Sequence, residues 1–249
     1  MSDLGDRMKR YESVSQVSLS IKTPVIIRLD GKSFHTFTKQ FDRPFDESLA
    51  DAMVDAARLT AEHIQGFKLA FTASDEVSFF VSDFDRIESC AWFDYNVQKM
   101  ASISADYMTA YFNDIIRAKV SCRSLAVFDS RVFNIPESDV PNYFLWRQKD
   151  WIKNSVSAYA SKFFSHKQLD GKTTSDRHEL LHTIGKNWAM DLSDRFKNGV
   201  YFTPADCPIY LDSPTYDTIE ELVFQEEKID DMFDALMEDP FTKTFGAPE

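Results

Sequence analysis

The chain has 249 residues, of which 43% are hydrophobic and 14% aromatic, enough to build a sizeable buried core. It contains no apolar run of about 18 residues, and the N-terminal sequence MSDLGDRMKRYESVS lacks the apolar segment of a secretion signal, so we expect neither a membrane span nor secretion. The three cysteines, Cys90, Cys122 and Cys207, are widely spaced, which disfavours a cysteine-based metal centre and indicates a reduced, cytoplasmic protein.

The net charge of −12 argues at first against a nucleic-acid partner, because phosphate binding relies on lysine and arginine. The acidic residues, however, are concentrated in residues 206–249, which hold 13 of the 40 acidic residues and only 2 of the 28 basic residues. The rest of the chain carries 27 acidic and 26 basic residues. It is therefore close to neutral and can present a local basic surface.

The first predicted strand, Val25 to Asp30, is rich in β-branched residues and ends in a carboxylate. Side chains alternate between the faces of a strand, so Arg28 and Asp30 share one face. The following Gly31 can present its carbonyl oxygen to an ion without a Cβ in the way, and the amides of Lys32 to His35 can surround an anion. An acid beside an arginine at the end of an apolar strand indicates a binding site.

A helix is predicted next, from about residue 44 to residue 65, followed by a hairpin with strands at Lys68 to Thr72 and Val77 to Val81. The turn of this hairpin would bring Asp75 near Asp30. Two carboxylates and the Gly31 carbonyl oxygen form an all-oxygen site, which suits Mg2+ better than zinc. The sequence therefore predicts a magnesium site where the first strand meets the hairpin.

The next elements complete an α+β fold. A linker and a long helix are expected within residues 83–115, and a further strand is expected at residues 120–128, leading to Arg131. This βαββαβ order is that of a ferredoxin-like fold. We expect residues 1–135 to form this domain. Residues 136–249 would form a helical C-terminal region that packs on it and ends in the acidic tail, 206–249.

Five segments of the chain occur in a characteristic order: RLDGKSFHTF, SDEVSFF, the lysine of NVQKM, FDSRVF and WRQKD. Together they resemble the tRNA(His) guanylyltransferase family, above all its bacterial and archaeal tRNA-guanylyltransferase-like branch. The resemblance implies that residues 1–135 are a palm-like catalytic domain. This domain would add nucleotides to the 5′ end of tRNA in the 3′-5′ direction, with two Mg2+ ions and with GTP, ATP or other NTPs as substrates. Family members are commonly tetramers, so it also implies a homo-oligomer.

The resemblance also implies roles for individual residues. Asp30 and Asp75 would be catalytic and would hold the metal ions with the Gly31 carbonyl, while the neighbouring Glu76 would assist. The nucleotide-binding residues would be Arg28, Gly31, Lys32, Ser33, Phe34, His35, Asp46, Ser74, Lys99 and Arg131. The tRNA contacts would be Arg147 and Asn154. After WRQKD the chain reads WIKNSVSAYA where eukaryotic members have His-x-Asn-Asn-x-Tyr-Asn, which favours repair of 5′-truncated tRNAs over strict tRNA(His) specificity.

Other interpretations of the sequence are open. A palm-type protein could bind tRNA or nucleotide without chemistry. The segment His178 to His182 matches the HExxH motif of zinc proteases, although Trp188 stands where an extended zinc site has a third histidine. The segment HKQLDGKT resembles the end of a P-loop, but His166 replaces the leading glycine. A cyclic-dinucleotide synthase would need a GGDEF-like loop, which the sequence lacks.

Overall fold

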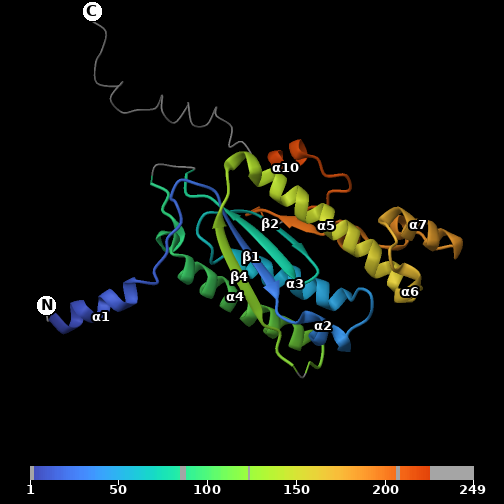
Figure 1. The fold of residues 1–249 in the computed structure, drawn as a ribbon, viewed down its shortest axis with the longest axis horizontal. Coiled ribbons are helices and arrows are strands. Elements are labelled where there is room, and N and C mark those ends of the chain that lie inside the picture. The colour runs from blue at the N-terminus through green and yellow to red at the C-terminus, as the bar shows by residue number, and fades with distance from the viewer. Residues whose placement is uncertain (1–2, 85–87, 123, 206–207, 225–249) are drawn as a thin grey trace, which may run out of the picture.

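The computed structural model describes residues 3–84, 88–122, 124–205 and 208–224. The described residues fold around an antiparallel sheet with the strand order β4-β1-β3-β2-β5 (Figure 1). These strands are β1 (Val25–Gly31), β2 (Phe67–Ala73), β3 (Glu76–Val81), β4 (Phe128–Asn134) and β5 (Val200–Phe202). The order of the first four strands is that of a ferredoxin-like fold, which confirms the predicted α+β class.

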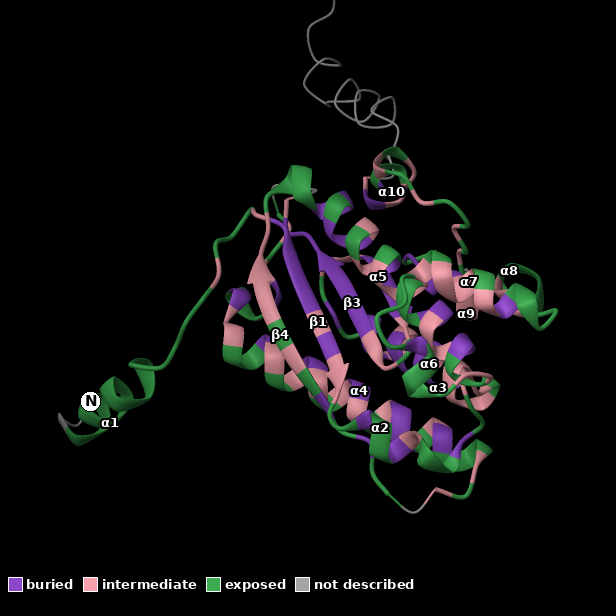
Figure 2. Ribbon diagram, turned by 45° about the vertical axis from the view of Figure 1, so that its right-hand side comes forward, coloured by how far each residue is buried: buried purple, intermediate pink, exposed green. Residues whose placement is uncertain are grey.

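The two faces of the sheet are covered by different helices, because alternate residues of each strand point to opposite sides. Val25, Ile27 and Leu29 of β1 are buried with residues of α3 (Glu47–Ala61) and α4 (Val97–Lys119). Ile26, on the other face, is buried with residues of α5 (Val140–Ser161) and α10 (Tyr216–Val223). Figure 2 shows that α5 lies beside β3 on this second face, whereas none of the described helices crosses β1 and β4 there.

Two capping residues fix where the helices of the first layer begin. The Asp46 side chain accepts a hydrogen bond from the Leu49 amide (2.9 Å) at the start of α3, and the Asn96 side chain accepts one from the Lys99 amide (3.0 Å) at the start of α4. Such caps satisfy amides that have no partner within the helix. The start of α3 in turn fixes the loop before it, which lines the cavity described below.

Shorter elements complete the described chain. The N-terminal helix α1 projects away from the body (Figure 1), and α6 to α9 form a small outlying layer with its own cluster around Tyr159, Leu169 and Leu181. The bounds are α1 (Asp3–Ser13), α2 (Phe34–Phe37), η1 (Thr38–Gln40), η2 (Trp92–Tyr95), η3 (Glu137–Asp139), α6 (His166–Leu169), α7 (Thr174–Thr183), α8 (Trp188–Asp191) and α9 (Asp194–Asn198). No helix among the described ranges is both long and apolar enough to cross a membrane.

Several predicted elements lie elsewhere. The strand expected at residues 120–128 was wrong: β4 begins at Phe128, because the Asn113 side chain binds both the amide and the carbonyl of Ala126 and holds the preceding segment as a loop. The long helix begins only at Val97. Strand β5 comes from the region predicted to be helical and pairs with β2, so the sheet contains residues from both sides of the expected boundary at 135. Of the acidic tail, residues 225–249 lie outside the described residues.

Candidate active site

The predicted acids meet at one end of the sheet. Strand β1 ends beside the β2–β3 turn, where the Gly31 amide donates a hydrogen bond to the Asp75 carbonyl oxygen (3.1 Å). In the ladder, Asp30 is the direct partner of Glu76. The structure therefore brings Asp30, Gly31 and Asp75 together, as the strand and hairpin pattern predicted.

The Asp75 carboxyl group sits in an environment that disfavours its charge. Burial raises the pKa of Asp75 above its ordinary value, and the nearby carboxylates of Asp30 and Glu76 raise it further, although a hydrogen bond from the Ser74 hydroxyl (2.9 Å) acts in the opposite direction. Within the described residues, neither Asp30 nor Asp75 forms an ion pair. Two neighbouring carboxylates that form no ion pair are a suitable ligand set for a cation, although the charge of Arg28 also acts on Asp30.

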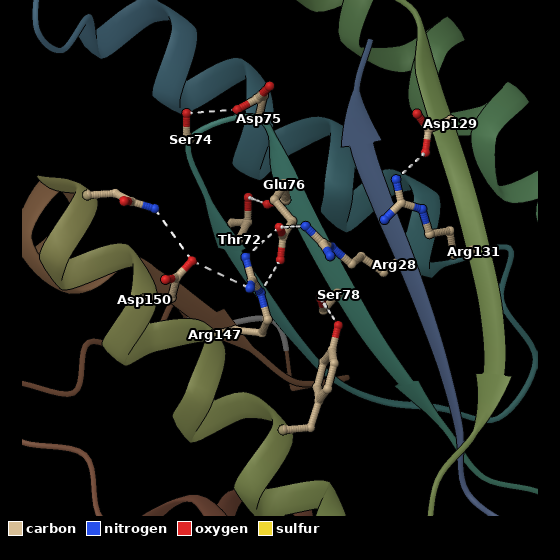
Figure 3. Close-up of polar contacts among 12 residues, drawn as sticks. Arg28, Thr72, Ser74, Asp75, Glu76, Ser78, Asp129, Arg131, Arg147 and Asp150 are labelled. Carbon is tan, nitrogen blue, oxygen red and sulfur yellow. Dashed lines mark hydrogen bonds and ion pairs between the residues drawn. The ribbon is translucent and has the colours of Figure 1, made fainter. Parts of the chain in front are cut away.

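Glu76 is placed differently from the two aspartates. Its carboxylate accepts hydrogen bonds from Arg147 Nε (2.5 Å), Arg147 Nη2 (2.6 Å) and Arg28 Nη2 (2.5 Å) (Figure 3). All three side chains are largely buried, with exposed fractions of 22% for Arg28, 13% for Glu76 and 12% for Arg147. We call these three residues the arginine clamp. The clamp occupies both oxygens of Glu76 and the guanidinium of Arg147, which was predicted to contact tRNA.

The predicted anion cradle after Gly31 is only partly free. The Gly31 amide is bonded to Asp75, and the Lys32 amide donates to the Val127 carbonyl oxygen (2.8 Å). The Phe34 side chain lies in the core, so only its backbone can contact a ligand. A Cβ on Gly31 would lie 2.3 Å from the Phe34 ring, which explains the glycine. The predicted cradle is therefore reduced to the amides from Ser33 to His35.

A cavity of about 510 Å3 adjoins the hairpin turn. It is bounded by the loop before α3, α3 itself, the turn of the hairpin, the C-terminal half of α5 and α9. Four predicted site residues line it: His35, Asp46, Ser74 and Asn154. Aromatic side chains from the loop, α5 and α9 also line it, with the Phe45 and Phe196 rings stacked at 4.9 Å. Its size and its mixture of aromatic and polar groups suit a nucleoside.

The two remaining predicted cations lie in different places. Arg131 of β4 is the ladder partner of Arg28 and is 60% exposed, with an ion pair to Asp129 at 3.8 Å. Lys99 lies in the first turn of α4, on the opposite face of the sheet, where the Val97 amide donates a hydrogen bond to the Val17 carbonyl oxygen. The structure therefore does not bring Lys99 to the acids of its own chain, although Lys99 was predicted to bind the nucleotide together with the residues around them.

Asp129 is a residue that the sequence interpretation did not select. It is the ladder partner of Asp30 on β4, so Asp129, Asp30 and Glu76 form one row across three strands. The segment FDSRVF contains this acid, but the strand was expected to end at Phe128. The pairing of Asp129 with Asp30 could therefore not be seen in the sequence. Asp129 is 54% exposed, in contrast to the buried Glu76.

The HExxH segment is accounted for by packing. His178 lies edge-on against Trp188 (5.7 Å between ring centroids), and burial together with the nearby His182 lowers the pKa of His178. In the described part of the chain, no third histidine, cysteine, aspartate or glutamate joins the two histidines to form a metal-binding group. The structure gives the zinc-protease interpretation no further support.

Comparison with known proteins agrees with this geometry. The family model described as tRNAHis guanylyltransferase (Thg1) matches residues 5–136. The chain is similar to a bacterial tRNA(His) guanylyltransferase (Thg1)-like protein solved in complex with ATP, at 38% identity and a TM-score of 0.83, covering 89% of this chain and 100% of that one. A structure of such a bacterial protein in complex with GTP matches at 36% identity and a TM-score of 0.74, covering 90% of this chain and 98% of that one.

A curated relative supports the same assignment. The tRNA(His) guanylyltransferase of Schizosaccharomyces pombe is 29% identical over 202 residues, which is 74% of each chain. The family model covers more than half of the sequence and includes β1, the hairpin and β4, which carry Asp30, Asp75 and Arg131. The chain therefore belongs to the tRNAHis guanylyltransferase (Thg1) family.

Proposed function

We propose that this protein is a Mg2+-dependent nucleotidyltransferase that adds nucleotides to the 5′ end of tRNA in the 3′-5′ direction, either to repair that end or to guanylylate it. The observation that carries the proposal is the meeting of Asp30 and Asp75, neither of which is paired with a base in the described residues, beside a nucleoside-sized cavity. The family assignment supports it, because relatives are named as tRNA(His) guanylyltransferases and related structures hold ATP or GTP.

The residues fit magnesium. Asp30, Asp75 and the Gly31 carbonyl supply oxygen ligands, which is the chemistry that Mg2+ prefers. Only two carboxylates take part, so nucleotide phosphates and water would complete the coordination of two ions. When bound, Mg2+ neutralises charge on the reacting phosphate and makes a sugar hydroxyl easier to deprotonate.

The chain's own groups would position the nucleotide. The cavity would hold the base, with His35 and Asp46 at its polar edge and the Phe45–Phe196 pair at its apolar wall. Ser74 lies at the turn between this cavity and Asp75, so a nucleotide whose base fills the cavity would direct its phosphates toward the acids. The amides after Gly31 would bind those phosphates.

The proposed direction of addition rests on the resemblance to the family. The 5′ end of the RNA would carry the activated phosphate, and the 3′-hydroxyl of the incoming nucleotide would attack it. Asn154 lines the cavity from α5 and is a candidate tRNA contact. The Arg147 guanidinium is instead bound to Glu76 and ion-paired with Asp150 (3.6 Å).

Pyrophosphate release separates this proposal from a palm that binds nucleotide and tRNA without chemistry. The wild-type chain should release pyrophosphate when incubated with Mg2+, GTP and a tRNA lacking its first nucleotide. It should not do so in EDTA or without RNA. Binding of both ligands with no RNA-dependent release would favour the non-catalytic alternative.

A further inference from the structure

Trp146 is a large aromatic side chain that the fold leaves in solvent. It is 54% exposed, whereas Trp92 in the core is 5% exposed. It lies on α5, one residue before Arg147 of the arginine clamp. An exposed tryptophan beside a cluster of arginines and acids is unusual in a surface that serves only for solvation, because the indole gains by burial.

The position of the Trp146 ring is fixed from two sides. Its edge packs against Tyr143 (5.9 Å between centroids, 67° between planes), and the Tyr143 hydroxyl is hydrogen-bonded to Ser78 of β3 (2.9 Å). The guanidinium of Arg147 lies 4.6 Å from the centroid of the Trp146 ring and is itself bound to Glu76 of β3. Both contacts therefore link Trp146 to β3, the strand that follows the turn containing Asp75. Because one face carries Arg147, the exposed surface belongs mainly to the other face and the free edges.

The surroundings of Trp146 favour a nucleic acid over a free nucleotide. The nucleoside-sized cavity is lined by α5 residues from Trp151 onward and does not include Trp146, so the two places are distinct. On the same side of the sheet, no helix in the described part of the chain lies across β1 and β4, and Arg131 is 60% exposed there (Figures 2 and 3). An open surface with a cation and an aromatic ring is the arrangement by which proteins hold single-stranded ends, through phosphate contacts and base stacking.

We propose that Trp146 is a stacking platform for the terminal nucleobase at the 5′ end of the RNA substrate. This inference rests on the proposed function, because it supposes that an RNA 5′ end approaches Asp30 and Asp75. Trp146 is a substrate-positioning residue: it touches the base and orients the RNA end, while the cavity binds the incoming nucleotide. Since every base has an aromatic face, stacking of this kind accepts different tRNAs.

The test is a binding comparison with full-length protein and a tRNA lacking its first nucleotide. Trp146→Ala should raise the dissociation constant for this RNA by about fivefold to a hundredfold, the range for loss of one base–aromatic stack. Trp146→Phe should stay within about threefold of wild type, because phenylalanine keeps an aromatic face. Met190→Ala, at another exposed apolar residue (81% exposed), is the matched control and should change nothing. Should Trp146→Ala fail to fold by circular dichroism, Trp146→Leu takes its place.

An RNA with an abasic ribose at its 5′ terminus makes the test specific for stacking. Wild type should bind this RNA more weakly than the intact one. Trp146→Ala should bind the two equally, because the indole ring and the terminal base stabilise the complex only when both are present. Unchanged RNA affinity in Trp146→Ala, or continued discrimination by it, would overturn the inference. So would an equal loss of GTP or ATP affinity, which would make the free nucleotide the occupant. Absence of RNA-dependent nucleotide addition by wild type would instead count against the proposed function, and the binding comparison would still decide the role of Trp146.

Discussion

Replacing Glu76 with alanine tests the arginine clamp, since it removes the carboxylate to which Arg28 and Arg147 are bound. Breaking a buried ion pair by removing one partner costs about 3–5 kcal/mol. Here the two arginines keep exposed fractions of 22% and 12%, so water partly screens them, and we expect the free energy of unfolding to fall by about 2–4 kcal/mol. In a chain of this length that corresponds to a melting temperature lower by roughly 10 °C.

Urea and thermal unfolding of Glu76→Ala, with Glu179→Ala as the control, would measure this effect. Glu179 is exposed and forms no ion pair within the described residues, so its replacement should change the free energy of unfolding by less than about 0.5 kcal/mol. A double-mutant cycle of Glu76→Ala and Arg147→Ala should show a large coupling free energy. Each single change already breaks the same contact, so the double variant should lose little more stability than either one. If Glu76→Ala were as stable as the control, the clamp would not be a structural element, and Glu76 would be free to act in catalysis.

Three further predictions concern Gly31, Asp75 and Asp46. Gly31→Ala should destabilise the fold by about 1–3 kcal/mol in urea unfolding, since its Cβ would overlap the Phe34 ring; a change below 0.5 kcal/mol would contradict this. In EDTA at pH 7, Asp75→Asn should have a higher free energy of unfolding than wild type. The pKa of the Asp75 carboxyl is raised in the folded state, so its ionisation costs stability above its ordinary pKa of 3.8. The stability difference between the variant and wild type should therefore vanish as the pH falls below that value. Asp46→Ala should lose about 1 kcal/mol from its cap on the Leu49 amide and should also raise KM for GTP, whereas a purely stabilising role would leave KM unchanged.

The first half of the site could be predicted because its signals are local. The alternation in β1 places Asp30 on one face, and the turn between β2 and β3 follows from the small and acidic residues at 73–76. Once those strands are neighbours, Asp30 and Asp75 must meet. The order of elements was likewise sufficient for the ferredoxin-like sheet.

The other half depends on contacts between distant segments. The bond between Glu76 and Arg147 joins residues 71 positions apart and exists only because α5 docks beside β3. The start of β4 depends on the Asn113 side chain, which no strand pattern reveals. Strand β5 has three residues and is too short to show a period. The position of Lys99 depends on the direction in which α4 runs across the sheet, and this direction cannot be read from the sequence.

The most direct test of the central claim is to locate the nucleotide that the wild-type protein adds. With Mg2+, labelled GTP and a tRNA lacking its first nucleotide, we predict that the label appears at the 5′ terminus and that Asp30→Asn and Asp75→Asn, both folded by circular dichroism, lower its incorporation by at least about a hundredfold. Label at the 3′ end, or full incorporation by both variants, would contradict the account.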